Sequence, residues 1–578
     1  MTKSSFSLAA AALAISLLTC SPQLSAGAKD AAPKSASTVT LRAIAGTGTV
    51  SGKVDAPKEF KAAEVYIRNA DKNIVYMVYT AAGHYQATDL LPGGYELTVR
   101  KNGFAADTKK LVIAAGDNAT LDFSLREAPL KPVLGVHPGY NGHKKQSASY
   151  EHLYPEGPGR PLIEKTCMVC HGPDFIPSHQ WSASQWNEAI DLMSDPNGLI
   201  KSRILPGTFS ARDREDLVDY LVKYYGPDSE PRHLEVPEMP LDEKALASAM
   251  YVEYDVPKQY GSPIHDEHFD QEGNVWVVNR AAGRPSIDKL DPRSGAWKSY
   301  PIPDPKALPH GMTLDGADDL WFAGETAFGR VNAKTGDMKL YYFDDKDSYI
   351  PLPGIGVGKD TKHESHGHTP VVDSRQNIWM TLSYTDQLAK WDRKTQEISK
   401  FSVPTAHSFP YGAYADKKDN IWVAEWFRCK VARFDPENEK FTEYALPNPP
   451  CTVKRMSVDS KGAAWYVADG GRLGSIDPKS GKVSEYAEPV AYASGYDVQP
   501  DPQDNLWISD SGQGGAIVKF DRATTKFTYY PSIQMTDMPK LEVTRDGAVW
   551  YSARSANIKA IGVLYPDMAK IKTLGAYY

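Results

Sequence analysis

The sequence predicts a mainly β protein in which a seven-bladed β-propeller, residues 250–578, follows a small α-helical domain and an N-terminal β-sandwich. Three observations predict this arrangement. Tryptophans recur about every 43 residues in the C-terminal half, two amphipathic helical segments lie in the middle, and short β-rich runs alternate with turns near the N-terminus. A chain of 578 residues is too long for one hydrophobic core, which also favours several domains.

The tryptophan repeat is the strongest of these signals. Successive members are 45, 58, 43, 43, 42 and 43 residues apart in the series Trp276, Trp321, Trp379, Trp422, Trp465, Trp507 and Trp550. Repeats of this length with several short strands each are typical of propeller blades. The one long interval predicts an insertion at 344–362, whose glycine-rich run at 353–358 suits a lid or spacer better than a phosphate-binding loop.

Residues 1–26 have the features of an export signal. Lys3 precedes an apolar run from Leu8 to Leu18, and small residues allow cleavage after Ala26. The expected location is therefore the bacterial periplasm or another exported site. Cys20 leaves a lipid anchor open as an alternative. No later stretch is apolar enough to predict a transmembrane span, and 65 Lys+Arg against 72 Asp+Glu give no basic footprint for nucleic acid.

The β-rich runs between residues 46 and 127 predict the N-terminal sandwich, with strands at 50–54, 63–67, 95–99, 111–113 and 121–125. The turn Leu91-Pro-Gly-Gly-Tyr95, the later Asn102-Gly-Phe104 and the opening Gly48-Thr-Val-Ser-Gly52 resemble the carboxypeptidase regulatory-like domain. That resemblance implies a transthyretin-type fold that acts as a spacer or docking module, and no active site is expected in it.

The motif Cys167-Met-Val-Cys170-His171 carries the most specific chemistry in the chain. Two thiols separated by two residues can each form a thioether with one haem, while the adjacent imidazole can bind its iron. A zinc site would need two further ligands close by, and His179 supplies only one. The motif therefore predicts one covalent haem c.

Two helices are expected after this motif. One spans about 185–194, and the other is capped by Ser210 with Asp213 three residues later and ends before Gly226-Pro227. The order of haem motif and helices over residues 150–228 resembles small c-type cytochromes. The resemblance implies that Met193 is the distal iron ligand opposite His171, with His179 as the alternative.

The two cysteines outside this region that follow the signal, Cys429 and Cys451, are the only possible disulfide pair once the haem thiols are assigned. Export permits such a bridge. Two buried free thiols are the alternative.

The propeller repeat also brings polar residues to equivalent positions. The residues eleven before each tryptophan are His265, His310, His368, Tyr411, Lys454, Tyr496 and Pro539. The residues three after are Asn279, Gly324, Leu382, Glu425, Ala468, Asp510 and Ala553. Antiparallel pairing is expected to place both sets on one face, toward the central channel. Three neutral imidazoles and the Glu425 carboxylate would then suit a divalent metal or a substrate, although such histidines can also simply hydrogen-bond strand ends.

The blade pattern, including Pro309-His310-Gly311-Met312 and Ile421-Trp422-Val423-Ala424-Glu425-Trp426, resembles the virginiamycin B lyase (streptogramin lyase) family over about residues 250–560. The resemblance implies a magnesium-assisted elimination that uses a channel histidine and a glutamate. His310 and Glu425 match these residues. In this chain they belong to different blades, and Tyr411 accompanies Glu425, so the predicted catalytic residues are His310, Glu425 and Tyr411.

A haem domain joined to a propeller is most economically interpreted as an oxidoreductase. The propeller would bind a small-molecule substrate, and the haem would pass electrons to an external partner. The alternatives are a metal-assisted carbon–oxygen lyase and a non-enzymatic electron-transfer or binding protein.

Overall fold

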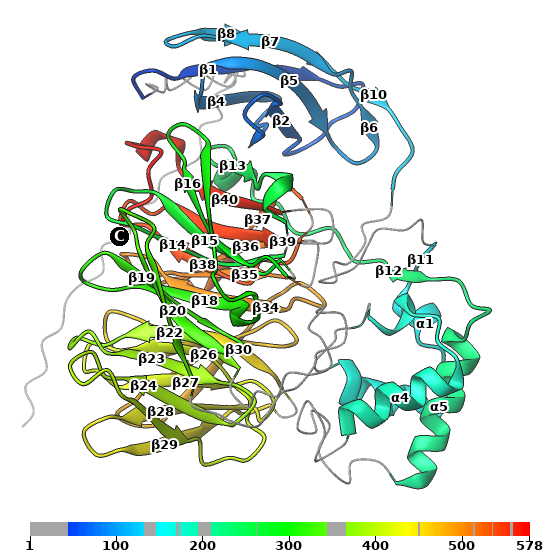
Figure 1. The fold of residues 1–578 in the computed structure, drawn as a ribbon. Helices are drawn as coiled ribbons and strands as arrows, with labels where there is room; N and C mark the ends of the chain where they lie inside the picture. The colour runs from blue at the N-terminus through cyan, green and yellow to red at the C-terminus, as the bar shows by residue number, and fades with distance from the viewer. Residues whose placement is uncertain are drawn as a thin grey trace, which may run out of the picture. The chain divides into compact units, whose positions relative to one another are not determined.

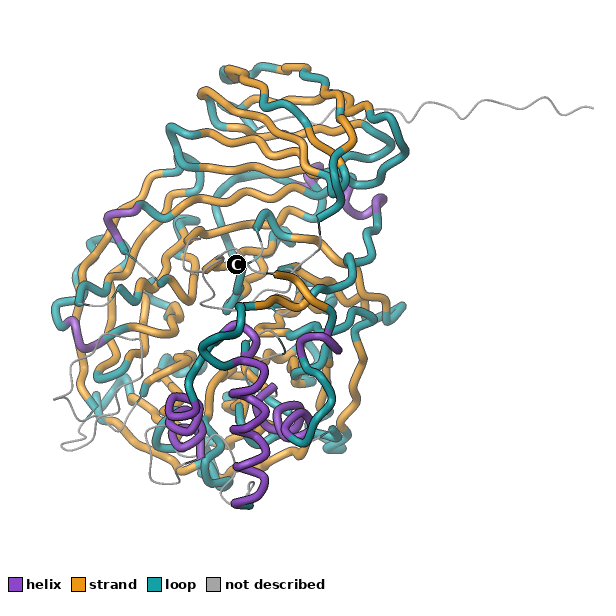
Figure 2. Tube along the Cα trace, turned by 90° about the vertical axis from the view of Figure 1, so that its right-hand side faces the viewer, coloured by secondary structure: helices purple, strands orange, loops and turns teal. Residues whose placement is uncertain are grey.

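The computed structural model describes residues 44–131, 146–168, 173, 175–194, 210–261, 263–281, 283–343, 366–448, 451–511, 515–534, 536–554 and 559–578. Strands dominate these residues, whereas the longer helices are confined to one stretch of the chain (Figure 2). The predicted signal, Cys20 and the 344–362 insertion lie outside the described residues. Within the described part of the chain, no helix is long and apolar enough to cross a membrane.

The N-terminal domain is the predicted β domain. Its strands are β1 (Gly48–Asp55), β2 (Glu64–Asn69), β3 (Ile74–Tyr79), β4 (His84–Leu90), β5 (Gly93–Arg100), β6 (Phe104–Ala105), β7 (Lys109–Ile113), β8 (Asn118–Thr120), β9 (Phe123–Ser124) and β10 (Arg126–Glu127). One sheet has the order β4-β1-β8, with β9 also on β1, and β3-β2-β5-β7 are consecutive in a second sheet. The prediction missed β3 and β4. All six residues of β3 are buried, so it lacks the alternation that marks a half-exposed strand.

The helical segment follows in the chain (Figure 1). Its elements are α1 (Tyr150–Leu153), α2 (Gly159–Leu162), the π-helix η1 (Ile163–Cys167), the 3-10 turn η2 (Ile176–Ser178), α4 (Ala183–Ser194) and α5 (Ala211–Tyr225). The two predicted helices are confirmed as α4 and α5. The Ser210 hydroxyl accepts a hydrogen bond from the Asp213 backbone N–H, and the Asp213 carboxylate accepts one from the Ser210 N–H, so a capping box begins α5. Parallel strands β11 (Gln146–Ala148) and β12 (Arg232–Leu234) flank this segment, and α6 (Glu243–Leu246) follows.

Six four-stranded antiparallel sheets form most of the β-propeller. They are β14 (Ile264–Phe269), β15 (Val275–Asn279), β16 (Ser286–Asp291), β17 (Ala296–Pro301); β18 (Pro309–Leu314), β19 (Asp319–Gly324), β20 (Ala327–Asn332), β21 (Met338–Tyr342); β22 (Gly367–Val372), β23 (Ile378–Leu382), β24 (Gln387–Trp391), β25 (Ile398–Ser402); β26 (Pro410–Ala415), β27 (Ile421–Glu425), β28 (Lys430–Asp435), β29 (Lys440–Ala445); β30 (Val453–Val458), β31 (Ala464–Ala468), β32 (Arg472–Ile476), β33 (Val483–Ala487); β34 (Gly495–Pro500), β35 (Leu506–Asp510), β36 (Ala516–Asp521) and β37 (Lys526–Pro531). Short 3-10 turns lie at η3 (Lys258–Tyr260), η4 (Pro305–Ala307) and η5 (Met568–Lys570).

The last strands, β38 (Leu541–Val543), β39 (Val549–Arg554) and β40 (Lys559–Tyr565), are joined by β13 (Met250–Asp255) from the start of the propeller segment. The first strands of successive sheets, β14, β18, β22, β26, β30, β34 and β38, each contact the next, and β38 contacts β14. The inner strands therefore close into a ring, and β13 and β40 join the two ends of the propeller segment.

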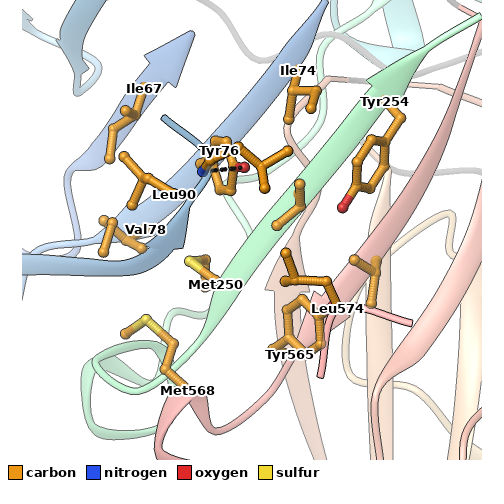
Figure 3. Packing of buried hydrophobic residues seen from close by; sticks show 14 of the residues in the cluster. Ile67, Ile74, Tyr76, Val78, Leu90, Met250, Tyr254, Tyr565, Met568 and Leu574 are labelled. Atoms are coloured by element: carbon orange, nitrogen blue, oxygen red, sulfur yellow. Dashed lines mark hydrogen bonds between the residues drawn. The ribbon is translucent and has the colours of Figure 1, made fainter. Parts of the chain in front are cut away.

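Strand β13 also pairs with β3, so a single eight-stranded sheet of order β38-β39-β40-β13-β3-β2-β5-β7 runs from the propeller into the N-terminal domain. One buried apolar cluster spans this junction (Figure 3). It includes Ile74 and Tyr76 of β3, Met250 and Tyr254 of β13, and Tyr565 of β40.

The repeated tryptophans are structural. In six of the seven repeats the indole N–H donates to an aspartate six residues earlier, over 2.9–3.3 Å, in the pairs Trp276–Asp270, Trp321–Asp315, Trp379–Asp373, Trp422–Asp416, Trp465–Asp459 and Trp507–Asp501. Trp550 instead stacks on Tyr254 of β13. In those six repeats the buried indole thus packs between sheets while its only polar atom is satisfied, as burial of tryptophan requires.

Cys429 and Cys451 form a disulfide with a Cα–Cα distance of 4.9 Å, which settles the alternative that the sequence left open. It links the turn between β27 and β28 to the segment before β30. Both cysteines belong to the buried cluster between these two neighbouring sheets.

Candidate functional site in the propeller and the haem motif

A β-bulge occupies the same position in the first strand of six sheets. In β26, Pro410 pairs with Glu425, and the register has shifted by one residue where Ala413 pairs with Val423. The same shift occurs in β14, β18, β22, β30 and β34. The expected register was therefore wrong by one residue, because Pro410, not Tyr411, lies opposite Glu425. Bulges re-aim side chains and are common beside functional sites.

The bulge residues meet in the centre of the inner strands, as the repeat predicted. We call them the inner ring: His265, His310, His368, Tyr411, Lys454 and Tyr496. Ring centroids are 3.9 Å apart for His265–His310, 3.7 Å for His310–His368 and 3.5 Å for His368–Tyr411. The Tyr411 and Tyr496 hydroxyls share a hydrogen bond, and the Lys454 ammonium lies 4.7 Å from the centre of the Tyr496 ring.

The three histidines of the inner ring are buried and neutral. Burial is the main cause that lowers the pKa of His265, His310 and His368 well below 6.5. Arg455 and Arg280 add to this lowering for His265 and His368, and Arg554 adds to it for His265. Such imidazoles are weak bases. They can donate and accept hydrogen bonds at neutral pH without carrying charge.

Several imidazole nitrogens have defined partners. His265 Nδ1 donates to Asp266 Oδ1 over 2.6 Å, and His368 Nδ1 lies 2.9 Å from the Thr369 hydroxyl. Among the described residues, His310 Nδ1 and His368 Nε2 have no hydrogen-bond partner although both atoms are buried. Buried polar atoms are rarely left in this state, so the inner ring retains unused capacity for a polar ligand.

A carboxylate that the prediction did not include lies beside the inner ring. Glu325 Oε2 accepts from His366 Nδ1 over 2.6 Å, and Glu325 Oε1 accepts from Arg280 Nη2 over 2.9 Å. The His366 ring is 5.5 Å from that of His310. Glu325 lies four residues after its repeat tryptophan, one position beyond the set that the sequence singled out.

Glu425 is fully buried at the end of β27. The pKa of its carboxyl group is raised to about 8, mainly by burial and also by Glu443, while Lys430 opposes the shift. No inner-ring histidine is among the principal causes of this shift. Lys430 lies opposite Glu425 in β28 and also bonds Glu443 at 2.8 Å. Among the described residues, both Glu425 carboxylate oxygens lack a hydrogen-bond partner, and the two charged groups that shift its pKa most, Glu443 and Lys430, belong to its own sheet.

The predicted propeller metal finds no ligand geometry in the described residues. No group of three or more His, Cys, Asp and Glu side chains among them is arranged to hold a metal ion. His265, His310 and His368 are instead packed ring against ring. A metal shared by these histidines and Glu425 stays a prediction.

The remaining histidines near the repeat positions are dispersed. His268 bonds the Tyr578 hydroxyl at the other end of β14, and the His407 backbone N–H donates to Asp386. His363 lies outside the described residues.

The helical segment has its own aromatic core. The Trp186 indole N–H of α4 donates to the Tyr225 carbonyl of α5 over 3.3 Å, and the Tyr225 hydroxyl bonds the Leu153 carbonyl of α1. Cys167 at the end of η1 is partly buried against this core. The Tyr154 hydroxyl donates to the Pro173 carbonyl over 2.6 Å, which anchors the chain two residues after the Cys-x-x-Cys-His sequence.

The donor set of this segment fits a covalent haem. Two thiols and an imidazole stand in the required order, and Cys167 lies at the edge of an apolar, aromatic cluster of the kind that a porphyrin face needs. Cys170 and His171 lie outside the described residues. Met193 is partly buried on α4, whereas the alternative ligand His179 is held between Phe175 and Trp181 with its Nδ1 2.8 Å from the Phe175 carbonyl oxygen.

Two family models match the chain. The virginiamycin B lyase family model matches residues 362–564, and the carboxypeptidase regulatory-like domain model matches residues 47–126. The chain thus contains a β-propeller that resembles the virginiamycin B lyase family and an N-terminal domain that resembles the carboxypeptidase regulatory-like domain. No curated protein sequence matches the chain.

Solved structures with a similar fold include a streptogramin B lyase, with 21% identity and a TM-score of 0.47 over 55% of this chain and 97% of that chain. A selenomethionine-substituted virginiamycin B lyase from Staphylococcus aureus has 19% identity and a TM-score of 0.47 over 55% and 99%. The extracellular domain of the putative one component system BT4673 from B. thetaiotaomicron has 13% identity and a TM-score of 0.40 over 52% and 38%.

Proposed function

We propose that the chain is an exported c-type haem oxidoreductase. Residues 150–228 would form the haem domain, and the six sheets together with β38, β39, β40 and β13 would make up seven propeller blades. The motif Cys167-x-x-Cys170-His171, followed by the two helices that such a domain requires, is the observation that carries the proposal.

Cys167 and Cys170 would hold the haem by thioethers, with His171 and Met193 on the iron. When bound, the haem supplies a one-electron carrier whose potential a thioether ligand raises relative to a second imidazole. The packing of Trp186 and Tyr225 fixes α4 against α5 and thereby the position of Met193.

The inner ring would bind the small-molecule substrate. Its imidazoles are neutral, so they favour an uncharged polar group with both donors and acceptors over an ion. His310 Nδ1 and His368 Nε2 are the atoms with unused hydrogen-bonding capacity. Tyr411, bonded to Tyr496 and packed on His368, would close one side of the site.

Haem attachment is tested on the exported full-length protein. Cys167→Ser and Cys170→Ser variants should lose the haem stain that survives denaturation, whereas Cys429→Ser should retain it. A wild-type protein without stable haem would contradict the proposal.

Substrate oxidation is then tested by screening small polar molecules for reduction of the haem and turnover with an artificial electron acceptor. His310→Ala and His368→Ala should lose turnover and keep their haem. Turnover equal to that of the wild type in these variants would show that the inner ring takes no part in the reaction.

A lyase is the second candidate, because the virginiamycin B lyase family model matches residues 362–564. Elimination product from a cyclic ester that persists in the haem-free Cys170→Ser variant would select it. If neither reaction occurs, the remaining interpretation is a non-enzymatic electron-transfer or binding protein.

A further inference from the structure

A cavity of about 350 Å³ lies beyond the inner ring. It begins one residue further along the inner strands, at Asp266 and Arg455, and continues to His268 and Glu542. None of the inner-ring residues lines it. The cavity lining and the inner ring therefore share no residue, although Asp266 of the lining bonds His265 of the ring.

Two buried charged residues line this cavity, and each has a polar atom that lacks a hydrogen-bond partner among the described residues. Asp266 is 1% exposed and Arg455 3% exposed. Asp266 Oδ1 accepts from both His265 Nδ1 at 2.6 Å and Arg455 Nη2 at 2.5 Å. Within the described residues, Asp266 Oδ2 and Arg455 Nε have no partner. Leaving buried charged groups incompletely paired is costly, which indicates that something else completes them.

A second pair of opposite charges lines the same cavity. Lys540 is 9% exposed and bonds Glu542, while Asp497 is 1% exposed and accepts the Leu541 backbone N–H over 2.9 Å. The cavity lining thus holds two positive groups, Arg455 and Lys540, and three negative ones, Asp266, Asp497 and Glu542. An anion or a cation alone would satisfy only one sign, whereas a molecule that carries both charges can pair with both.

We propose that this cavity binds a small zwitterion of the α-amino-acid type. The carboxylate pairs with Arg455 and Lys540, and the ammonium group pairs with Asp266 and Asp497. The volume lies at the lower end of the range for small-molecule sites, which suits a single free amino acid. The proposal does not depend on the haem or on the reaction at the inner ring.

The test uses the full-length protein and isothermal titration with L-alanine as the probe. Acetate and methylammonium, which each carry one of the two charges, are the comparison ligands. We expect L-alanine to bind and both half-ligands to bind at least about tenfold more weakly, as the loss of one charge-assisted contact predicts. No binding of L-alanine, or equal affinity for either half-ligand, would overturn the proposal.

Two variants locate the binding. Thr313→Tyr adds a bulky ring to the cavity lining and replaces neither member of the Asp266–Arg455 pair, whereas Arg455→Gln removes the positive partner. Both should weaken L-alanine binding at least about tenfold. Arg522→Gln is the matched control, because Arg522 pairs with buried Asp459 at 2.8 Å outside this cavity. The affinity of this variant for L-alanine should equal that of the wild type.

Thermal unfolding of each variant establishes that it is folded. If Arg455→Gln does not fold, Thr313→Tyr decides, and undiminished binding by that variant would overturn the proposal. Haem content is recorded for every sample, so that failure of the proposed oxidoreductase function is seen separately.

Discussion

At the scale of single residues, the propeller gathers polar groups where apolar ones would pack more easily. The inner ring places three imidazoles and two phenols in a fully buried position, and burial lowers the pKa of each imidazole. Burial of polar groups is costly unless they are hydrogen-bonded, and two of the imidazole nitrogens have no partner. Such an arrangement is expected where the residue types serve ligand binding rather than the stability of the fold.

Met193→Ala tests the distal ligand of the proposed haem. Loss of the thioether should lower the reduction potential and allow external ligands such as cyanide or imidazole to bind, because the sixth position then opens. Potentiometry and ligand titration of the oxidised protein measure both effects. Met338→Ala, a partly buried methionine on β21, is the control and should change neither. An unchanged potential in Met193→Ala would transfer the role to His179.

Glu253 gives the fold a pH dependence. It is fully buried on β13, and although Tyr551 and Gln534 donate to it, burial raises its pKa from 4.5 to about 7. A raised folded-state pKa means that stability present below pH 4.5 is lost as the pH rises through 7.

Glu253→Gln should remove this loss, so its stability relative to wild type should increase by about 3 kcal/mol between pH 4.5 and pH 8. Denaturant unfolding at several pH values measures the difference. Glu397→Gln, an exposed glutamate before β25, should follow the wild type. Parallel curves for Glu253→Gln and wild type would contradict the assignment.

The repeat pointed to the six residues of the inner ring, because equivalent positions in a repeat occupy equivalent places, but it also included Pro539, which the ring does not contain. It did not predict the bulge that sets Pro410 rather than Tyr411 opposite Glu425. The same bulge recurs in six sheets, so it does not disturb the regular spacing of the tryptophans. Nor did the repeat indicate the pairing of Asp266 with Arg455, which come from sheets far apart in sequence.

At the scale of elements, local signals were the most reliable. The Ser210 and Asp213 spacing predicted the first turn of α5, where the same two residues form the capping box. Strand β3 was missed because all six of its residues are buried. The pairing of β13 with β40 was not expected, because strand partners distant in sequence leave no local pattern.

The disulfide between Cys429 and Cys451 should contribute to propeller stability. It closes a loop with a sequence separation of 22 residues, for which chain entropy predicts about 3 kcal/mol. The double variant Cys429→Ala/Cys451→Ala should therefore unfold at lower denaturant concentration, and a reductant should produce a similar shift in the wild type only. Haem content should not change. A variant as stable as the wild type would show that the bridge does not constrain the unfolded chain.

At the scale of the whole molecule, β13 unites two regions that the sequence presents as separate domains. It is paired on one side with β40 and on the other with β3, and one apolar cluster includes all three strands. The helical segment has a core of its own. Cooperative units follow shared cores and continuous hydrogen-bond ladders more closely than they follow sequence boundaries.

Hydrogen exchange of the native protein should therefore show β3 and β13 opening together. Their amides should have the same free energy of opening and the same dependence on denaturant. The two strands share the hydrogen-bond ladder from Ile74–Tyr254 to Val78–Met250, so breaking it exposes both strands at once. Amides of α5 should open with a different free energy, since Leu217 and Leu221 pack in the helical core. Exchange of β2 and β3 at a lower free energy of opening than β13 would show instead that the N-terminal domain unfolds independently of the propeller.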